Sequence, residues 1–170
     1  MKLNLGCNTR IRDGYINVDR DKYDGVDVVA DVSKLPFKDG EAEEVYASHI
    51  AEHFHHTRTL EVLKEWHRVL KPGGILKIAV PDFQRAVEIY LKTGFQPWIR
   101  NFLWGDPGYE GAFHYTGFDE KSLTAILKEA GFEDIARVEK LPGCQHNECS
   151  NNVSNIDYKP VSLNMVCVKI

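Results

Sequence analysis

The chain has 170 residues and a formal net charge of −4, with 21 lysines and arginines against 25 aspartates and glutamates. This is the length of one domain, so we expect residues 1–170 to form a single domain. The composition, 43% hydrophobic and 27% charged, is typical of a globular protein, and the mild acidity argues against a nucleic-acid binder. No apolar run approaches the roughly 18 residues of a membrane span. Four scattered cysteines fit a reducing compartment, so we expect a cytoplasmic location.

Short apolar runs open the chain and predict strands at 3–5, 16–19, 26–30 and 44–47. A helix is predicted next, because apolar and aromatic residues recur at three- and four-residue spacing at Leu60, Leu63, Trp66, His67 and Leu70. The Lys-Pro-Gly-Gly sequence at 71–74 ends that helix. The remaining predicted elements are a strand at 75–80, helices at 83–92 and 119–130, and strands at 135–141 and 163–170. Strands that alternate with helices indicate an α/β fold with a mainly parallel sheet.

The first three predicted strands are unusually close together in the sequence. Ten residues separate Leu5 from Ile16, and six separate Asp19 from Val26. A parallel crossover normally needs about a dozen residues or more. We therefore expect the helices between these strands to be absent or reduced to a turn, and another segment to cover the sheet face that they leave open.

Gly6 follows the first predicted strand, Asp19 ends the second and Asp31 follows the third. Glycine lets a backbone approach a ligand closely, and an acid at the end of a strand can accept hydrogen bonds from ribose hydroxyls. The carboxyl ends of parallel strands form the edge at which open α/β sheets bind ligands. The three residues together predict a nucleotide-type site.

Four segments carry a family resemblance: Leu-Asn-Leu-Gly-Cys at 3–7, Asn-Val-Asp at 17–19, Ala-Asp-Val at 30–32 with Leu-Pro-Phe at 35–37, and Arg-Val-Leu-Lys-Pro-Gly-Gly at 68–74. With these segments the chain resembles the class I S-adenosylmethionine-dependent methyltransferases, and in particular short stand-alone members of the type 11 kind linked with surface polysaccharides. The resemblance is strong over about 2–82 and weaker beyond. It implies a Rossmann-like, mostly parallel sheet with an antiparallel last strand, and S-adenosylmethionine as cofactor.

The resemblance also implies roles for individual residues. The turn at Gly6 would pass under the methionine part of the cofactor, Asp19 would hold the ribose, and Asp31 and Val32 would contact the adenine. The full set of cofactor residues that it implies is Asn4, Leu5, Gly6, Cys7, Asn8, Asp19, Asp31, Val32, Ser48 and His49. Two positions depart from the family pattern, because Asn4 replaces the usual acid and Asn8 replaces the second glycine. Asn8 is compatible with the turn if its backbone is left-handed.

Two groups of residues offer metal ligands. His49-x-x-Glu52-His53 matches an inverted zinc-peptidase motif, but it follows a strand directly, and the sequence shows no third ligand. Cys144, His146 and Cys149 form a loose second set without an obvious fourth ligand. A metalloprotein that uses either group is an alternative, but we assign no metal ligand from the sequence.

Residues 83–118 form a glycine-punctuated insert that holds ten of the 18 aromatic residues, among them Tyr90 and Phe102, which we expect to be core. We expect this insert to cap the site, to recognise the substrate or to form a homodimer surface. The candidate bases for methyl transfer are His49, Asp82 and His114.

The fourth strand is followed by Ser48-His49-Ile50-Ala51 rather than by the signature of amino-directed DNA methyltransferases. We therefore expect transfer of a methyl group to a small molecule or sugar-type intermediate, with no nucleic-acid partner. The alternative is a non-catalytic module that acts through a dimer or partner interface.

Overall fold

The computed structural model describes residues 1–94, 97–106, 108, 111–144 and 161–170. Within these described residues, seven strands form one sheet in the order β3-β2-β1-β4-β5-β7-β6. Their bounds are Lys2–Leu5 (β1), Ile16–Asp19 (β2), Val28–Val29 (β3), Ala42–Ser48 (β4), Leu70–Pro81 (β5), Phe132–Val138 (β6) and Ser162–Lys169 (β7). The strands from β3 to β5 pair in parallel, whereas β7 pairs antiparallel with both β5 and β6. The predicted α/β class, with a mostly parallel sheet and an antiparallel last strand, is confirmed.

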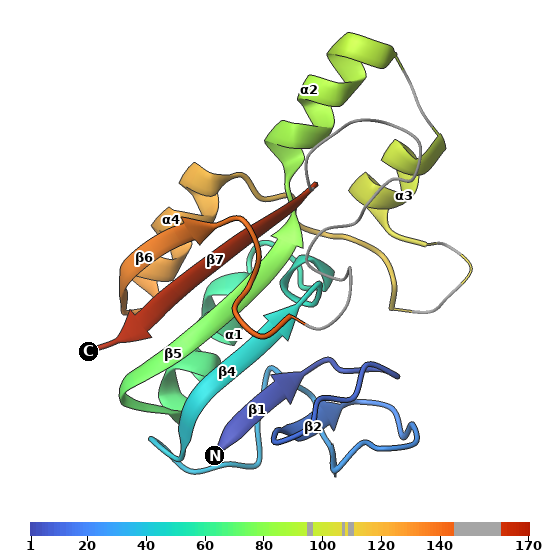
Figure 1. Cartoon of the computed structure of the whole chain (residues 1–170). Coiled ribbons are helices and arrows are strands. Elements are labelled where there is room, and N and C mark those ends of the chain that lie inside the picture. The colour runs from blue at the N-terminus through green and yellow to red at the C-terminus, as the bar shows by residue number, and fades with distance from the viewer. Residues whose placement is uncertain (95–96, 107, 109–110, 145–160) are drawn as a thin grey trace.

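Helices cover one face of this sheet (Figure 1). α1 (Thr59–Val69) and α4 (Glu120–Glu129) lie behind the strands and pack on the main core. Trp66 of α1 is fully buried, and its Nε1 donates to the carbonyl of Val32 at 3.0 Å. This bond ties the helix to the segment that follows β3. Within the described residues, none of the helices has both the length and the apolar character that crossing a membrane demands.

The opposite face carries no helix between β1, β2 and β3, as the short spacings predict. The segment after β6 crosses this face (Figure 1). Leu141 and Cys144 of that segment pack against Tyr46 of β4 and Ala79 of β5. The guanidinium of Arg12, from the β1–β2 turn, lies 3.8 Å from the centre of the Tyr46 ring. A cation stacked on an aromatic ring and a loop therefore take the place of crossover helices on this face.

Several strand boundaries differ from the sequence prediction, among them those of β3, β5 and β6. β3 is reduced to Val28–Val29, two residues of the expected 26–30. β6 begins at Phe132 rather than at 135, because Phe132 is buried and pairs with Lys169 directly after α4. β5 begins at Leu70, so the Lys-Pro-Gly-Gly sequence ends α1, as predicted, but already belongs to the strand.

The described residues of the segment 83–118 stand beyond the carboxyl ends of β4 and β5 (Figure 1). They contain α2 (Phe83–Thr93) and α3 (Pro97–Trp104), the second of which the sequence pattern did not predict. The two helices share a small core with residue 161, formed by Ala86, Ile89, Ile99, Phe102 and Val161. Phe102 is buried as expected, but Tyr90 is 49% exposed, so its prediction as core is wrong. Phe95 and Tyr109 lie outside the described residues.

Candidate functional site

The turn after β1 has the shape that a close ligand approach requires. Gly6 has φ +62°, and a Cβ at this position would meet Cδ1 of Ile50 at 2.7 Å. No other residue fits both the conformation and the space. Asn8 is also left-handed, with φ +47°, which is the condition under which it can replace the family's second glycine.

Asp19 at the end of β2 holds this turn in place. Its Oδ2 accepts a hydrogen bond from the Asn8 backbone N–H at 2.8 Å, and its Oδ1 accepts one from Asp21 N–H at 3.0 Å. Each carboxylate oxygen has a second lone pair, so the group can still accept from a ligand. Asp31 follows β3 on the surface and accepts from Ser33 N–H at 2.8 Å, while Val32 next to it is buried.

A cavity of about 680 Å³ opens along the carboxyl ends of β1, β2 and β4. All ten residues that the resemblance implies for the cofactor line it, namely Asn4, Leu5, Gly6, Cys7, Asn8, Asp19, Asp31, Val32, Ser48 and His49. These residues come from four separate segments, so the fold brings the whole implied set to one space. Cys7 is 3% exposed, and burial, with the charge of Asp19, raises the pKa of its thiol to about 11.

Part of the cavity wall comes from residues that sequence reasoning did not assign: Thr9, Arg10, Arg20, Tyr46, Ile50, His53, Phe54, Gly111, Ala112 and Tyr115. The last three belong to the insert. Gly111 lies so close to Arg20 that a Cβ would meet its guanidinium at 2.6 Å. The insert also bonds to the segment after β4, since the backbone N–H groups of Tyr115 and Thr116 donate to the carbonyl of Glu52. The insert therefore forms part of the cavity wall and is held against the segment after β4.

Asn4, which replaces the family's usual acid, belongs to a buried amide network. Its Nδ2 donates to the carbonyl of Arg10 at 3.0 Å and to Oδ1 of Asn17 at 2.9 Å. Oδ1 of Asn17 also accepts from the backbone N–H of Arg12 at 2.9 Å, which fixes the orientation of both amides. The amide of Asn4, which replaces the usual acid, therefore fits the hydrogen-bonding groups around it.

His49 follows β4 with a left-handed φ of +54°. Its Nε2 lies 2.9 Å from Oγ of Ser162, and its Nδ1 lies 3.2 Å from Oε1 of Glu52. Glu52 is fully buried. Burial acts to raise the pKa of Glu52, but the contact with His49 and the nearby His53 and His114 outweigh it, so the pKa falls below its ordinary value. The carboxylate is therefore ionised at neutral pH.

His114 comes from the insert and lines a second, smaller cavity of about 230 Å³. The other residues around it are Pro81, Phe83, Phe102, Leu103, Trp104, Tyr115, Thr116 and Gly117. Tyr115 lines both cavities. Burial lowers the pKa of His114, which favours the neutral imidazole, and its Nδ1 bonds to the carbonyl of Phe102 at 2.9 Å.

Asp82, the third predicted base, lies elsewhere. It caps α2 by accepting from Arg85 N–H at 3.1 Å, and its other oxygen accepts from Arg137 at 2.9 Å. It lines neither cavity and is 2% exposed. The geometry gives Asp82 a structural position at the foot of the insert.

The structure can be compared with the two metal-ligand patterns of the sequence. The zinc-peptidase motif does not form a long helix, because η1 contains only Ala51–His53. Of the second set, His146 and Cys149 lie outside the described residues. Cys144 is disulfide-bonded, so its sulfur is not available as the thiolate ligand that this zinc set requires.

A family model described as a methyltransferase domain matches residues 7–78. The demethylmenaquinone methyltransferase of Protochlamydia amoebophila is 32% identical over 122 residues, which are 65% of this chain and 48% of that protein. The chain thus spans about half the length, or less, of the curated relatives it matches.

Solved structures give the same fold. A SAM dependent methyltransferase from Archaeoglobus fulgidus has a TM-score of 0.67 at 19% identity, covering 99% of this chain and 85% of that one. The 1,6-didemethyltoxoflavin-N1-methyltransferase of Burkholderia thailandensis, solved with that compound and S-adenosylhomocysteine, has a TM-score of 0.59 at 17% identity, covering 99% and 70%. A methyltransferase-domain model thus matches part of the chain, and the chain has the class I S-adenosylmethionine-dependent methyltransferase fold.

Proposed function

We propose that this domain transfers the methyl group of S-adenosylmethionine to a small molecule. The observation that carries the proposal is the 680 Å³ cavity, which gathers all ten residues implied for the cofactor by the family resemblance. In the proposed complex the Gly6 turn contacts the methionine part, Asp19 accepts from the ribose hydroxyls, and Asp31 and Val32 contact the adenine. The relatives named above support this assignment by the activity in their names.

The methyl acceptor would occupy the 230 Å³ cavity under the insert. Its wall is mainly apolar and aromatic, with Phe83, Phe102 and Trp104 among the lining residues. The hydroxyl of Thr116 already donates to the carbonyl of Phe54 at 2.7 Å, so His114 and the hydroxyl of Tyr115 are the polar side-chain groups that we expect to face an acceptor. Such a wall favours a planar, largely apolar acceptor over a sugar with many hydroxyls.

Methyl transfer from a sulfonium is an in-line displacement, so most of the catalysis comes from alignment of donor and acceptor. Tyr115 lines both cavities and is the side chain between the two reactants in this proposal. His49 and Ser48 line the cofactor side, and His114 lines the acceptor side. We assign these three to positioning the reactants, and residues 83–118 to excluding water as a cap.

The test is calorimetric titration with S-adenosylhomocysteine, which binds without turnover. The wild-type chain should bind at micromolar concentration. Asp19→Ala should weaken binding roughly 10²–10⁴-fold, because two charge-assisted hydrogen bonds of about 1.5–3 kcal/mol each are lost.

Asp27→Ala is the matched control. The carboxylate of Asp27 also accepts two hydrogen bonds, from the backbone and side chain of Asn17, but it does not line the cavity. Affinity should survive in this variant. Absence of binding to the wild-type chain at millimolar ligand would refute the proposal and favour the non-catalytic module.

We propose as well that α2 supports the predicted homodimer. Phe83, Val87, Tyr90 and Leu91 are 47%, 39%, 49% and 76% exposed. Their spacing puts them on one helix face. Sedimentation should show a dimer that Leu91→Glu converts to a monomer, and a monomeric wild-type chain would refute this proposal.

A further inference from the structure

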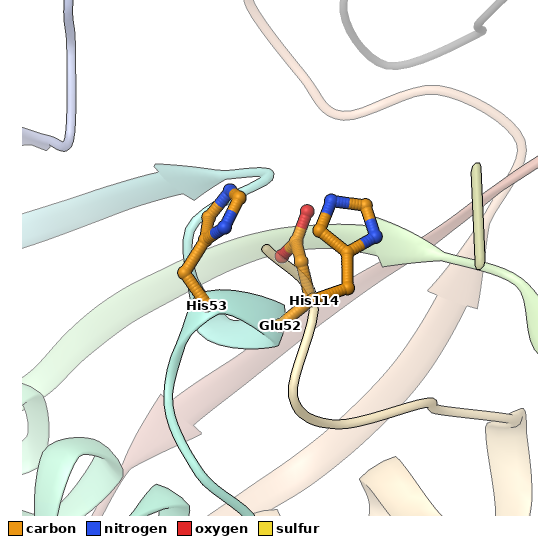
Figure 2. A group of neighbouring side chains, drawn as sticks. All are labelled: Glu52, His53 and His114. Atoms are coloured by element: carbon orange, nitrogen blue, oxygen red, sulfur yellow. The ribbon is translucent and has the colours of Figure 1, made fainter. Parts of the chain in front are cut away.

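Glu52, His53 and His114 converge at the junction of the two cavities. Glu52 and His53 are neighbours on η1, whereas His114 is brought in by the insert. One potential ligand atom from each residue lies within 4.8 Å of the other two. Figure 2 shows the two imidazole rings on either side of the Glu52 carboxylate. Glu52 and His53 belong to the zinc-peptidase motif of the sequence, but its other histidine, His49, is not part of this group.

The carboxylate of Glu52 is completely buried, and within the described residues neither of its oxygens accepts a hydrogen bond. Its ion-pair contact is with Nδ1 of His49 at 3.2 Å, outside hydrogen-bond geometry. A buried carboxylate is normally paired, hydrogen-bonded or coordinated to a metal. The buried Glu52 carboxylate therefore offers oxygen atoms that a bound cation could neutralise and use as ligands.

Each histidine has one ring nitrogen held by a backbone carbonyl. Nδ1 of His53 lies 2.9 Å from the carbonyl of Phe113, and Nδ1 of His114 lies 2.9 Å from the carbonyl of Phe102. A carbonyl only accepts, so each Nδ1 is the donor in this contact, and Nε2 is the ring nitrogen that a metal ion would use. Metal-ligating histidines almost always have such an outer hydrogen bond, which fixes the ring.

The backbone holds the three side chains together before any ion arrives. The carbonyl of Glu52 accepts from Tyr115 N–H at 2.8 Å and from Thr116 N–H at 3.3 Å. The rings of His53 and His114 are 5.0 Å apart and nearly perpendicular. This geometry costs little to organise, which favours tight binding.

We propose that Glu52, His53 and His114 bind a divalent transition-metal ion. Two imidazoles and one carboxylate are the ligands of catalytic zinc and of non-haem iron, whereas magnesium and calcium prefer oxygen alone. Three protein ligands leave a coordination position open. Since His53 lines the larger cavity and His114 the smaller one, that position faces their junction. An oxygen of the methyl acceptor could occupy it, a role that rests on the proposed function, whereas the binding of the ion does not.

The experiment uses the full chain after treatment with a chelator. Calorimetry with Zn²⁺ should show one tight site, and Co²⁺ should give a visible spectrum without thiolate charge-transfer bands. Glu52→Gln and His114→Ala should each weaken Zn²⁺ binding about 100-fold or more. His55 and His56 provide the control, because they are exposed neighbours with rings 4.3 Å apart and form the obvious surface site.

The double variant His55→Ala/His56→Ala should keep the tight site. Loss of binding in this double variant, or unchanged binding in Glu52→Gln and His114→Ala, would overturn the proposal. Thiolate bands in the Co²⁺ spectrum would show that cysteine binds the ion, which would also overturn the proposal. This readout uses the wild-type chain, so it stays valid even if the substituted variants fail to fold. The same samples are also titrated with S-adenosylhomocysteine. Because this titration measures cofactor binding and the Zn²⁺ titration measures metal binding, a failure of the metal site can be told apart from a failure of the proposed function.

Discussion

Replacing Asn4 by aspartate would restore the acid usual in class I methyltransferases, and the structure predicts that this change destabilises the chain. The amide is 3% exposed, and its Nδ2 faces two oxygens, the Arg10 carbonyl and Oδ1 of Asn17. The backbone N–H of Arg12 fixes Oδ1 of Asn17 in that place. An ionised aspartate has no donor, so it would present an oxygen to both acceptors.

The expected loss follows from the bonds. One net hydrogen bond to Asn17 is worth about 1 kcal/mol, and the buried Arg10 carbonyl left without its donor costs about 1–3 kcal/mol. The free energy of unfolding at pH 7 should therefore fall by about 2–4 kcal/mol. Burial and the facing oxygens raise the pKa of the new carboxyl in the folded state. The protonated acid can donate one bond, so the deficit should be smallest below about pH 4 and grow as the pH rises through the folded-state pKa.

Urea unfolding of the variant and the wild-type chain at pH 4 and pH 7 measures this deficit. Asn101→Asp makes the same chemical change on the exposed surface of α3 and should leave the unfolding free energy within about 0.5 kcal/mol. A variant as stable as the wild type at pH 7, with tighter binding of S-adenosylhomocysteine, would refute the reasoning. Asn4 would then be a weakened cofactor residue rather than part of a matched network.

Two further predictions concern the same cavity. Gly6→Ala should lower the unfolding free energy by about 2–5 kcal/mol, because the added Cβ causes left-handed strain and overlaps with Ile50. Gly14 is also left-handed, but nothing lies within 4 Å of an added Cβ, so Gly14→Ala should lower the unfolding free energy by only about 1–2 kcal/mol. Equal losses for the two variants in urea unfolding would exclude the overlap. The raised pKa of about 11 at Cys7 means that its alkylation, followed by peptide mass, should keep rising roughly tenfold per pH unit from pH 8 to pH 10. A plateau near pH 9 would show an ordinary thiol.

The cofactor edge could be predicted from the sequence because its signals are local. Gly6 and Asp19 each end a short apolar run, and the topology of parallel strands then places them side by side. The left-handed φ of Asn8 was likewise predictable, since the family pattern has glycine there. The reduced crossovers followed from residue counts alone.

The rest depends on contacts between distant segments. Nothing in the sequence around His114 indicates that it meets Glu52, because hydrogen bonds from Tyr115 and Thr116 to the Glu52 carbonyl bring the two together. The hydrogen bond between the side chains of Asn4 and Asn17 could not be predicted for a related reason. Each reads as a polar residue within a strand, and their pairing depends on the register of β1 against β2. Helix α3 was missed because its aromatic residues are also typical of a cap.

The missing crossover helix has a consequence for the proposed cofactor site. A helix that follows the glycine turn presents unpaired N–H groups and a positive dipole end, which attract an anion such as a carboxylate. Here β1 leads to β2 without a helix, so that contribution is absent. The same turn instead places Arg10 in the cavity wall, next to Thr9. A guanidinium carries a full positive charge, so this turn still contributes positive charge to the wall of the proposed cofactor site without a helix end.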